Sequence, residues 1–277
     1  MGVVSVRRSK TLAKLRAGRP VKMCALGGAF LPAYIRHAAH QGFDCIWLDL
    51  EHRAMEQREL QALLAFFHLC DIDCMVRAPT LEKTRLYRYL EDGAAGIMIP
   101  HVSTPEKAHM LAQSVKFPPL GDRGYDGAGL DTDFYLQGTG DYTEQANRET
   151  FLAVQIETIE AVENVEKIAA VPGVDILFVG PADLSLRIKH APNLAWTYDD
   201  ALNRVAAACK KHGKHWGLPA GSPDVIQQLY DKGARFLNYG GDFGALLAML
   251  AKNSAELDEI YRENRQPVQP LVRPADA

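Results

Sequence analysis

One stretch of the sequence, residues 151–185, limits the fold more than any other. It contains two apolar runs of strand length, Phe151–Ile156 and Ile176–Val179, and apolar residues at helical spacing lie between them. Two parallel strands need a crossover connection, which a helix can supply. The stretch therefore predicts a strand, helix, strand unit of an α/β protein.

The carboxylates of this unit follow its strands. Glu157 comes directly after the first strand, and Asp183 follows the second after Gly-Pro-Ala. The carboxyl ends of parallel strands form the face where ligands bind, and two oxygen donors there suit Mg²⁺ or Mn²⁺. A purely structural role fits each acid as well, with Glu157 in the first turn of a helix and Asp183 as an N-cap.

The same alternation continues along the whole chain of 277 residues. Strand candidates lie at 21–25, 43–49, 74–77, 96–100, 151–156, 176–179, 215–218 and 235–239. Four helical patterns stop at a glycine just before a strand, at Gly42, Gly93, Gly213 and Gly233, where a left-handed cap is expected. Eight such units favour an α/β fold closed as a (β/α)₈ TIM barrel over an open sheet.

Two regions do not fit a simple barrel. Residues 116–150 are too long and glycine-rich for an ordinary connection, which indicates a functional or interfacial segment. Helical patterns at 243–252 and 254–264 contain more helix than one barrel unit needs, and we expect the second, an extra C-terminal helix, to pack on a neighbouring subunit. We predict one barrel domain over 1–265 and a mobile, proline-containing tail over 266–277.

Composition narrows the class of partner. The net charge of −3 comes from well-mixed acids and bases, which argues against nucleic acid and against an anionic membrane. Neither a membrane span nor a signal peptide is evident, so we expect a cytoplasmic protein with a small-molecule ligand. The five scattered cysteines indicate buried, reduced thiols, and Cys70 and Cys74 alone do not predict a zinc site.

Three polar side chains at strand ends suggest acid-base chemistry. Arg77 ends the run CMVRAP, where a fixed guanidinium could hold a carboxylate or an oxyanion, although an arginine paired with a nearby acid is an equal alternative. His52 is a candidate general acid or base whose tautomer Asp49 could fix, whereas a lone histidine would more often be structural. His101 has a similar location but no evident partner.

These residues combine into one kind of chemistry. Free amides at Ala182 and Asp183 would bind a substrate carboxylate where a helix begins, while Asp183 holds a metal ion. A divalent ion chelated by a 2-oxo acid, an arginine on the same oxygens and a proton-carrying histidine would together stabilise an enolate.

Several motifs resemble one known family. They are WLDLEHR at 47–53, VRAP at 76–79, RYLEDGAAGIMIPHV at 88–102, GDRG at 121–124 and VQIETIEAVENVEKIAAVPGVDILFVGPADLS at 154–185. Together they resemble the HpcH/HpaI aldolases over about residues 10–260. These are metal-dependent (class II) pyruvate aldolases, including 4-hydroxy-2-oxoheptanedioate and 2-keto-3-deoxyglucarate aldolases and macrophomate synthase.

The resemblance implies a barrel with a swapped C-terminal helix in a homo-oligomer, either dimers, trimers or a hexamer of two trimers. It implies cleavage or formation of the C3–C4 bond of a 4-hydroxy-2-oxo acid, giving pyruvate and an aldehyde. It also implies a role for each site residue: Glu157 and Asp183 as ligands of Mg²⁺, Mn²⁺ or Co²⁺, Arg77 on the pyruvate oxygens, His52 oriented by Asp49 as the acid-base residue, and Gln155, Pro181 and Ala182 in the pyruvate pocket.

The sequence departs from the family pattern at three places. Arg53 stands where glycine is common, His101 stands where methionine is common, and the loop after Arg123 differs from the usual run. We hypothesise that these changes alter the pocket on the aldehyde side. Two other functions remain open: a β-hydroxyacyl-CoA lyase of the citrate lyase β-subunit type, for which no basic cluster is evident, and a non-catalytic oxo-acid or metal-binding barrel.

Overall fold

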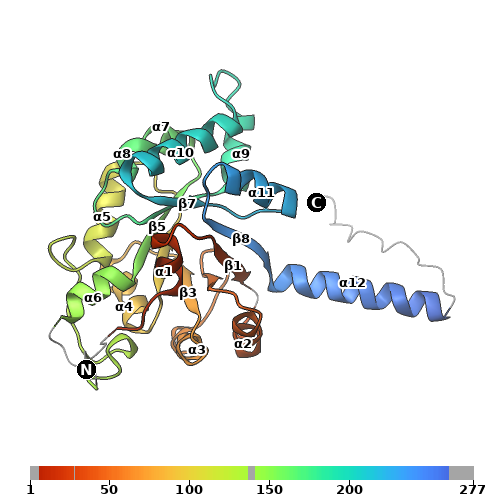
Figure 1. Ribbon diagram of the computed structural model, residues 1–277, viewed down its shortest axis with the longest axis horizontal. Helices are drawn as coiled ribbons and strands as arrows, with labels where there is room; N and C mark the ends of the chain where they lie inside the picture. The colour runs from red at the N-terminus through yellow and green to blue at the C-terminus, as the bar shows by residue number, and fades with distance from the viewer. Residues whose placement is uncertain (1–5, 28, 137–140, 262–277) are drawn as a thin grey trace, which may run out of the picture.

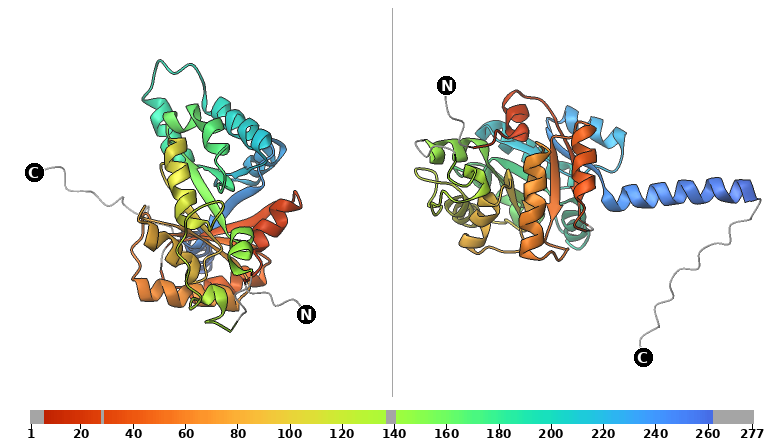
Figure 2. Two further views of the ribbon diagram at one scale, coloured as in Figure 1. Left: turned by 90° about the vertical axis from the view of Figure 1, so that its left-hand side faces the viewer. Right: turned by 90° about the horizontal axis from the view of Figure 1, so that it is seen from below.

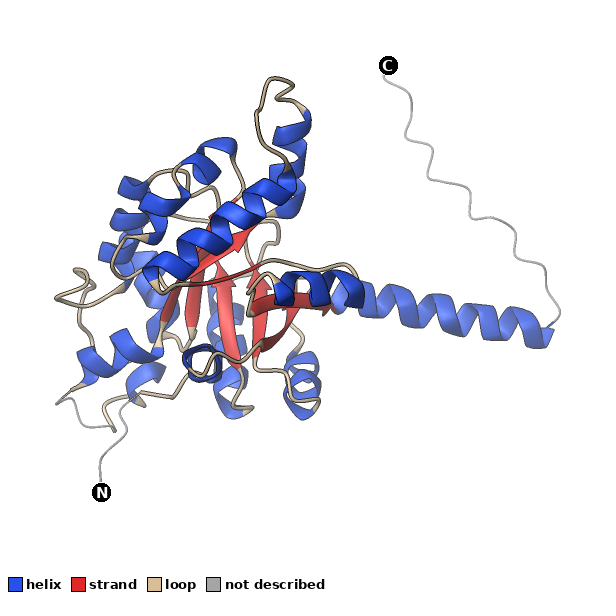
Figure 3. Ribbon diagram, turned by 45° about the horizontal axis from the view of Figure 1, so that its top comes forward, coloured by secondary structure: helices blue, strands red, loops and turns tan. Residues whose placement is uncertain are grey.

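The protein is a parallel barrel of strands covered by helices (Figure 1 and Figure 3). The structure, a computed structural model, describes residues 6–27, 29–136 and 141–261. The strands are β1 (Val21–Leu26), β2 (Cys45–Asp49), β3 (Asp73–Arg77), β4 (Gly96–Ile99), β5 (Phe151–Ile156), β6 (Ile176–Val179), β7 (His215–Gly217) and β8 (Phe236–Gly241). Their order is β7-β6-β5-β4-β3-β2-β1-β8, so the predicted (β/α)₈ barrel is confirmed.

The barrel closes where β7 meets β8. The amide of Arg235 donates to the carbonyl of Trp216 at 3.1 Å, and that of Asn238 donates to the carbonyl of Leu218 at 3.2 Å. This approach depends on Gly217, because a Cβ there would overlap the carbonyl oxygen of Phe236. The glycine therefore lets β7 and β8 approach closely enough to close the barrel.

We expect Gly217→Ala to lower the free energy of unfolding by about 3 kcal/mol, because the overlapping atom belongs to the backbone and cannot rotate away. Chemical denaturation measures the change. Gly221→Ala is the matched control, since a Cβ at Gly221 meets nothing within 4 Å. Equal stability of the two variants would contradict the importance of this close approach.

The helices surround the strands (Figure 2). They are α1 (Lys10–Arg16), α2 (Pro32–His40), α3 (Gln57–Leu69), α4 (Lys83–Glu91), α5 (Pro105–Val115), η1 (Leu130–Thr132), α6 (Tyr142–Glu149), α7 (Ile159–Glu163), α8 (Val165–Ala169), α9 (Pro181–Lys189), α10 (Tyr198–His212), α11 (Pro223–Asp231) and α12 (Asp242–Tyr261). All four glycines predicted to end helices have positive φ, between 64° for Gly213 and 108° for Gly93.

The structure corrects the helical predictions in two regions. The single helix expected between β5 and β6 is two short ones, α7 and α8, which break at Asn164. There the Asn164 side chain donates to the carbonyl of Ser103 at 3.0 Å, and asparagine generally competes with helical hydrogen bonds. The two helices expected after β8 are one continuous helix, α12.

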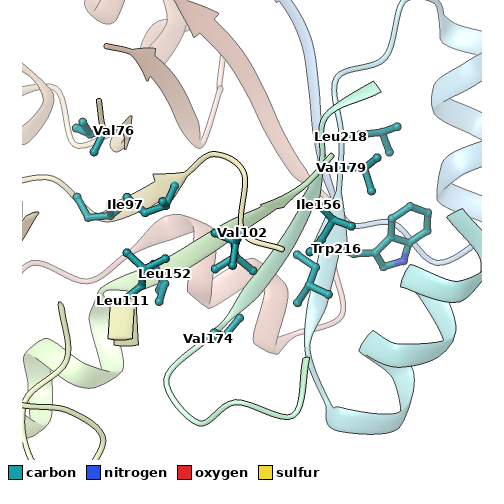
Figure 4. Close-up of a cluster of buried hydrophobic side chains, with 14 of the residues drawn as sticks. Val76, Ile97, Val102, Leu111, Leu152, Ile156, Val174, Val179, Trp216 and Leu218 are labelled. Atoms are coloured by element: carbon teal, nitrogen blue, oxygen red, sulfur yellow. The ribbon is translucent and has the colours of Figure 1, made fainter. Parts of the chain in front are cut away.

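Side chains of the strands pack in two layers because successive residues point to opposite faces. Outward-pointing residues pack under the helices, among them Val76, Ile97, Leu152, Ile156 and Val179 (Figure 4). Inward-pointing residues fill the barrel, among them Met23, Met75, Met98, Phe178 and Phe236. The same alternation places Asp49, Arg77 and Gln155 two residues beyond inward-pointing Trp47, Met75 and Ala153. The two-residue period of the strands thus points these polar side chains into the barrel mouth.

Buried charges hold segment 116–150 together and join it to the rest of the barrel at Asp175. Lys116 Nζ donates to the carbonyl of Thr150 at 2.7 Å and lies 2.9 Å from a carboxylate oxygen of Asp175. Arg123 lies 3.1 Å from the carboxylate of Asp131. Residues 137–140 are outside the described part of this segment. Its functional or interfacial role stays a prediction.

Helix α12 projects from the barrel as a single arm (Figure 1). Only Asp242 at its start is buried, while its large apolar side chains are exposed: Phe243, Leu246, Leu247, Met249, Leu250, Leu257, Ile260 and Tyr261. These apolar side chains are therefore largely uncovered by the described part of the chain. The predicted tail, 266–277, lies outside the described residues, and the single domain over 1–265 stays a prediction.

The cysteines are free thiols, and four of the five are buried, as predicted, whereas Cys70 is partly exposed. Burial raises the pKa of Cys24 to about 11 and that of Cys209 to about 12, which makes both poor nucleophiles at neutral pH. In residues 6–27, 29–136 and 141–261, no helix is both long and apolar enough to cross a membrane.

Candidate active site

The predicted site residues come from the carboxyl ends of four elements around the barrel mouth. Asp49 ends β2 and Arg77 ends β3, and the two residues are paired directly across the sheet. Gln155 lies in β5, Glu157 follows it, and Asp183 lies in the first turn of α9, directly after β6. The parallel topology therefore brings together residues that are more than 130 positions apart in the sequence.

Two acids fix the orientation of the Arg77 guanidinium. Its Nε donates to Asp49 Oδ1 at 2.9 Å, its Nη2 lies 2.8 Å from Asp49 Oδ2, and its Nη1 lies 2.8 Å from Glu51 Oε2. The guanidinium also lies over the Trp47 ring, with Cζ 4.6 Å from the ring centroid. Only 8% of Arg77 is exposed, so its planar fork has a fixed direction.

This pairing changes the chemistry of Asp49. Burial alone would raise the pKa of its carboxyl group, but the hydrogen bond and the charge of Arg77 outweigh burial and lower that pKa. Asp49 also accepts hydrogen bonds from the backbone amides of Glu51 at 3.0 Å and His52 at 3.5 Å. It is therefore an ionised residue that fixes Arg77 and the loop after β2.

The structure does not have the expected contact between Asp49 and the His52 ring. The ring Nε2 of His52 lies 3.6 Å from Glu51 Oε2, and 57% of the histidine side chain is exposed. A buried bidentate partner binds a carboxylate more strongly than an exposed imidazole does, so Asp49 pairs with Arg77. Asp49 reaches His52 only through the backbone, and Glu51 is the acid beside the ring.

Glu157 is the most buried acid of the cluster, with 2% of its surface exposed. Its Oε1 accepts from the backbone amide of His101 at 2.7 Å and lies 3.0 Å from the His101 ring, and its Oε2 accepts from Gln155 Nε2 at 2.9 Å. Burial raises the pKa of Glu157, and the charges of Asp183 and Glu51 raise it further against the opposing effect of His101. The surroundings of Glu157 therefore favour an added positive charge.

Two residues of the cluster were not among the predicted site residues: Glu51 had no assigned role, and His101 was a weaker candidate without an evident partner. Glu51 links the groups at the mouth, since one of its oxygens contacts Arg77 and the other lies 3.7 Å from His101 Nε2. His101 has a left-handed backbone, φ 54°, and Lys107 Nζ donates to its carbonyl at 2.9 Å. The available signal was position, because His101 follows β4 closely and Glu157 follows β5.

Asp183 is the third residue of α9 and is not its N-cap, which is Gly180. Its Oδ1 accepts from Arg187 Nη1 at 2.7 Å, and 44% of its side chain is exposed. A Cβ at Gly180 would overlap the Glu157 carboxylate, so the start of α9 lies against Glu157. The amides of Ala182 and Asp183 precede the first intrahelical hydrogen bond, from Leu184 to Gly180, and face outward from the helix end.

The donors of this cluster fit a hard divalent cation. Glu157 and Asp183 offer carboxylate oxygens, and Gln155 Oε1 is a buried acceptor without a hydrogen-bond partner in the described structure. Across the described ranges, no group of three or more histidine, cysteine, aspartate or glutamate side chains is arranged to hold an ion. Two carboxylates still suffice for Mg²⁺, which commonly keeps several waters and binds substrate oxygens.

A (β/α)₈ barrel with a fixed arginine and clustered carboxylates at its mouth is typical of enzymes, whose active sites lie at this end of the barrel. Residues 27–248 match the model of one family, described as HpcH/HpaI aldolase/citrate lyase. The chain belongs to this family. It is therefore a carbon–carbon lyase of the aldolase type.

Individual relatives agree with the family. The chain is 35% identical to a hydroxypyruvate/pyruvate aldolase of Deinococcus radiodurans, over 91% of each chain. It is 34% identical to a 5-keto-4-deoxy-D-glucarate aldolase of Klebsiella pneumoniae, over 76% of this chain and 82% of the relative. The crystal structure of an HpcH/HpaI aldolase from Desulfitobacterium hafniense superimposes with a TM-score of 0.82 at 30% identity, covering 93% of this chain and 98% of that one.

Proposed function

We propose that this enzyme is a divalent-metal-dependent aldolase for 4-hydroxy-2-oxo acids. It cleaves or forms the C3–C4 bond, with pyruvate or a related 2-oxo acid as one product and an aldehyde as the other. The observation that carries the proposal is the Arg77 guanidinium, fixed by Asp49 and Glu51 in the same cluster as buried Glu157. The names of the Deinococcus and Klebsiella aldolases support the same type of substrate.

Glu157 and Asp183 would hold the ion, which we propose to be Mg²⁺, Mn²⁺ or Co²⁺. Gln155 fixes one Glu157 oxygen and keeps its own Oε1 available beside it. A bound divalent ion would polarise the 2-oxo group and stabilise negative charge on it.

The side chains around the ion site bind the substrate, stabilise the developing charge and transfer a proton. Arg77 donates to the oxygens of the 2-oxo acid and stabilises the charge that develops as the C3–C4 bond breaks. The amides of Ala182 and Asp183, at the N-terminus that Pro181 begins, bind the substrate carboxylate. His52 takes the proton of the C4 hydroxyl group, and Glu51, 3.6 Å away, stabilises the imidazolium that forms.

Pyruvate release tests this proposal. The enzyme is treated with EDTA and supplied with 4-hydroxy-2-oxo acids of several lengths, with and without Mg²⁺, Mn²⁺ or Co²⁺. We expect release that returns only with added metal. Metal binding without release from any substrate would contradict the aldolase proposal.

The proposal extends to assembly and location. The exposed apolar side chains of α12 form a surface that a second copy of the chain could cover, so we propose a homo-oligomer, a trimer or hexamer, in which α12 packs on a neighbour. The free thiols support a reducing compartment, and we propose the cytoplasm.

We expect Leu247→Glu combined with Leu250→Glu to convert the oligomer to a 30.6 kDa monomer, because two charges would enter the covered face of α12. Light scattering coupled to size-exclusion chromatography measures the molar mass. Lys252→Glu, on the same helix, should keep the oligomer. A monomeric unaltered protein at micromolar concentration would refute the assembly proposal.

A further inference from the structure

Four aromatic rings contact one another in series inside the barrel. Phe151, Phe236, Phe178 and Trp47 come from β5, β8, β6 and β2, and they pack within the group of side chains that fills the space between the strands. The centroids of successive rings are 5.9 Å apart for Phe151 and Phe236, 5.9 Å for Phe236 and Phe178, and 5.6 Å for Phe178 and Trp47. All three contacts are edge-to-face, an arrangement that stabilises each ring in one orientation.

This series of rings ends directly below Arg77. Trp47 is paired across the sheet with Met75, the inward-pointing residue two positions before Arg77 on β3. The Arg77 Cζ lies over the Trp47 ring, 4.6 Å from its centroid. A cation is attracted to the face of an indole ring, most strongly where water is excluded. The Trp47 ring therefore lies between the guanidinium and the interior of the barrel.

The ring and the two acids restrain Arg77 in different directions. Asp49 and Glu51 contact its nitrogen atoms. Because the N–H groups of a guanidinium lie in its plane, these contacts are made at its edges. Edge contacts alone would let the group tilt or move deeper into the barrel. The ring face of Trp47 opposes both movements, so it sets the direction of the N–H groups that remain for a substrate.

We propose that Trp47 is a positioning residue that holds Arg77 at the depth and tilt at which it meets the 2-oxo acid. This inference rests on the proposed aldolase function. Trp47 acts through Arg77 and not on the reacting atoms. Its Nε1 is buried without a hydrogen-bond partner in the described structure, so the aromatic face, and not the polar group, carries the role.

The test measures the exchange of the methyl protons of pyruvate with solvent, at saturating pyruvate and with Mn²⁺ present. We expect Trp47→Met, which keeps much of the volume but has no aromatic face, to lower the rate by about 30-fold, the value of a desolvated cation–π contact. Trp47→Phe keeps a ring face and should stay within about threefold of the unaltered enzyme.

Trp196→Met is the matched control. The ring of Trp196 also carries an arginine, with Arg204 Cζ 5.2 Å from its centroid, but Arg204 lies on α10, which contributes no residue to the site. This variant should keep the full rate. If Trp47→Met does not fold, Phe178→Leu replaces it, because Phe178 is the ring that supports Trp47. A lower rate is expected for that variant too, and an unchanged rate would refute the proposal.

Combining Trp47→Met with Arg77→Lys separates positioning from a general loss of packing. Lysine has no planar fork for the ring to orient, so Trp47→Met should cost little once Arg77 is lysine. A structural role for Trp47 would instead give a double variant whose loss is the product of the two single losses.

Two results separate this inference from the proposed function. If the unaltered enzyme exchanges the methyl protons, but Trp47→Met keeps the full rate or its loss multiplies with that of Arg77→Lys, the role of Trp47 is refuted alone. If the unaltered enzyme shows neither methyl exchange nor pyruvate release with metal present, the aldolase proposal and the role of Trp47 are both refuted.

Discussion

Glu157→Gln is expected to lower metal-dependent pyruvate release by about 10³-fold or more. Glutamine preserves the shape of the side chain but removes the negative charge proposed to hold the ion. Burial and the nearby charges of Asp183 and Glu51 raise the pKa of Glu157, so the folded protein already disfavours that charge. We therefore expect the unfolding temperature of the metal-free variant to stay the same or rise while activity and metal affinity fall.

Calorimetric titration with Mn²⁺ and the initial rate of pyruvate release measure the two losses. Glu163→Gln is the matched control, because Glu163 is an exposed acid at the end of α7, the helix that follows β5 and Glu157. The variant at Glu163 should keep both properties. Full activity in Glu157→Gln would exclude Glu157 as a ligand.

Arg77→Lys is expected to lower kcat by about 10²- to 10³-fold, the usual cost of removing one donor to a developing oxyanion. Lysine keeps the charge, but it cannot reach Asp49 and Glu51 with a flat fork and still direct a donor at the substrate. Arg77→Gln removes the charge as well and leaves two acids unpaired. For that variant we expect a further loss of about 3 kcal/mol in the free energy of unfolding.

Steady-state kinetics and chemical denaturation separate the two effects. The exposed Arg85, changed to Lys in the same way, serves as the control for a general effect of the substitution. If Arg77→Lys retained kcat within a factor of three, Arg77 would be a structural arginine, the alternative that its pairing with two acids also allows.

The architecture was predictable from local patterns because each of them acts over a few residues. The bounds of β5 and β6 agree with the apolar runs, and Gly42, Gly93, Gly213 and Gly233 each have the predicted positive φ. Strand ends then located the candidate site, since a parallel barrel gathers all carboxyl ends on one face. Even Arg77 and Asp49 could be placed at the mouth in this way.

The partners of these side chains were not predictable, because they depend on how side chains at the ends of different strands meet in space. The sequence suggests that Asp49 contacts the ring of His52, three residues away. The pairing of β2 with β3 instead places Asp49 in an ion pair with Arg77. For the same reason the sequence indicated no role for Glu51 and no partner for His101, although both contact groups from other strands. The continuity of α12 past Asn253 was missed because asparagine is common where helices end.

Exchange of the methyl protons of pyruvate in D₂O tests the central claim most directly, because it needs only the half of the reaction that Arg77, Glu157 and Asp183 would perform. Proton NMR follows the loss of the methyl signal. The account predicts exchange with Mg²⁺, Mn²⁺ or Co²⁺, none after EDTA treatment and none in Glu157→Gln. Absence of exchange in an enzyme that binds the metal would contradict it.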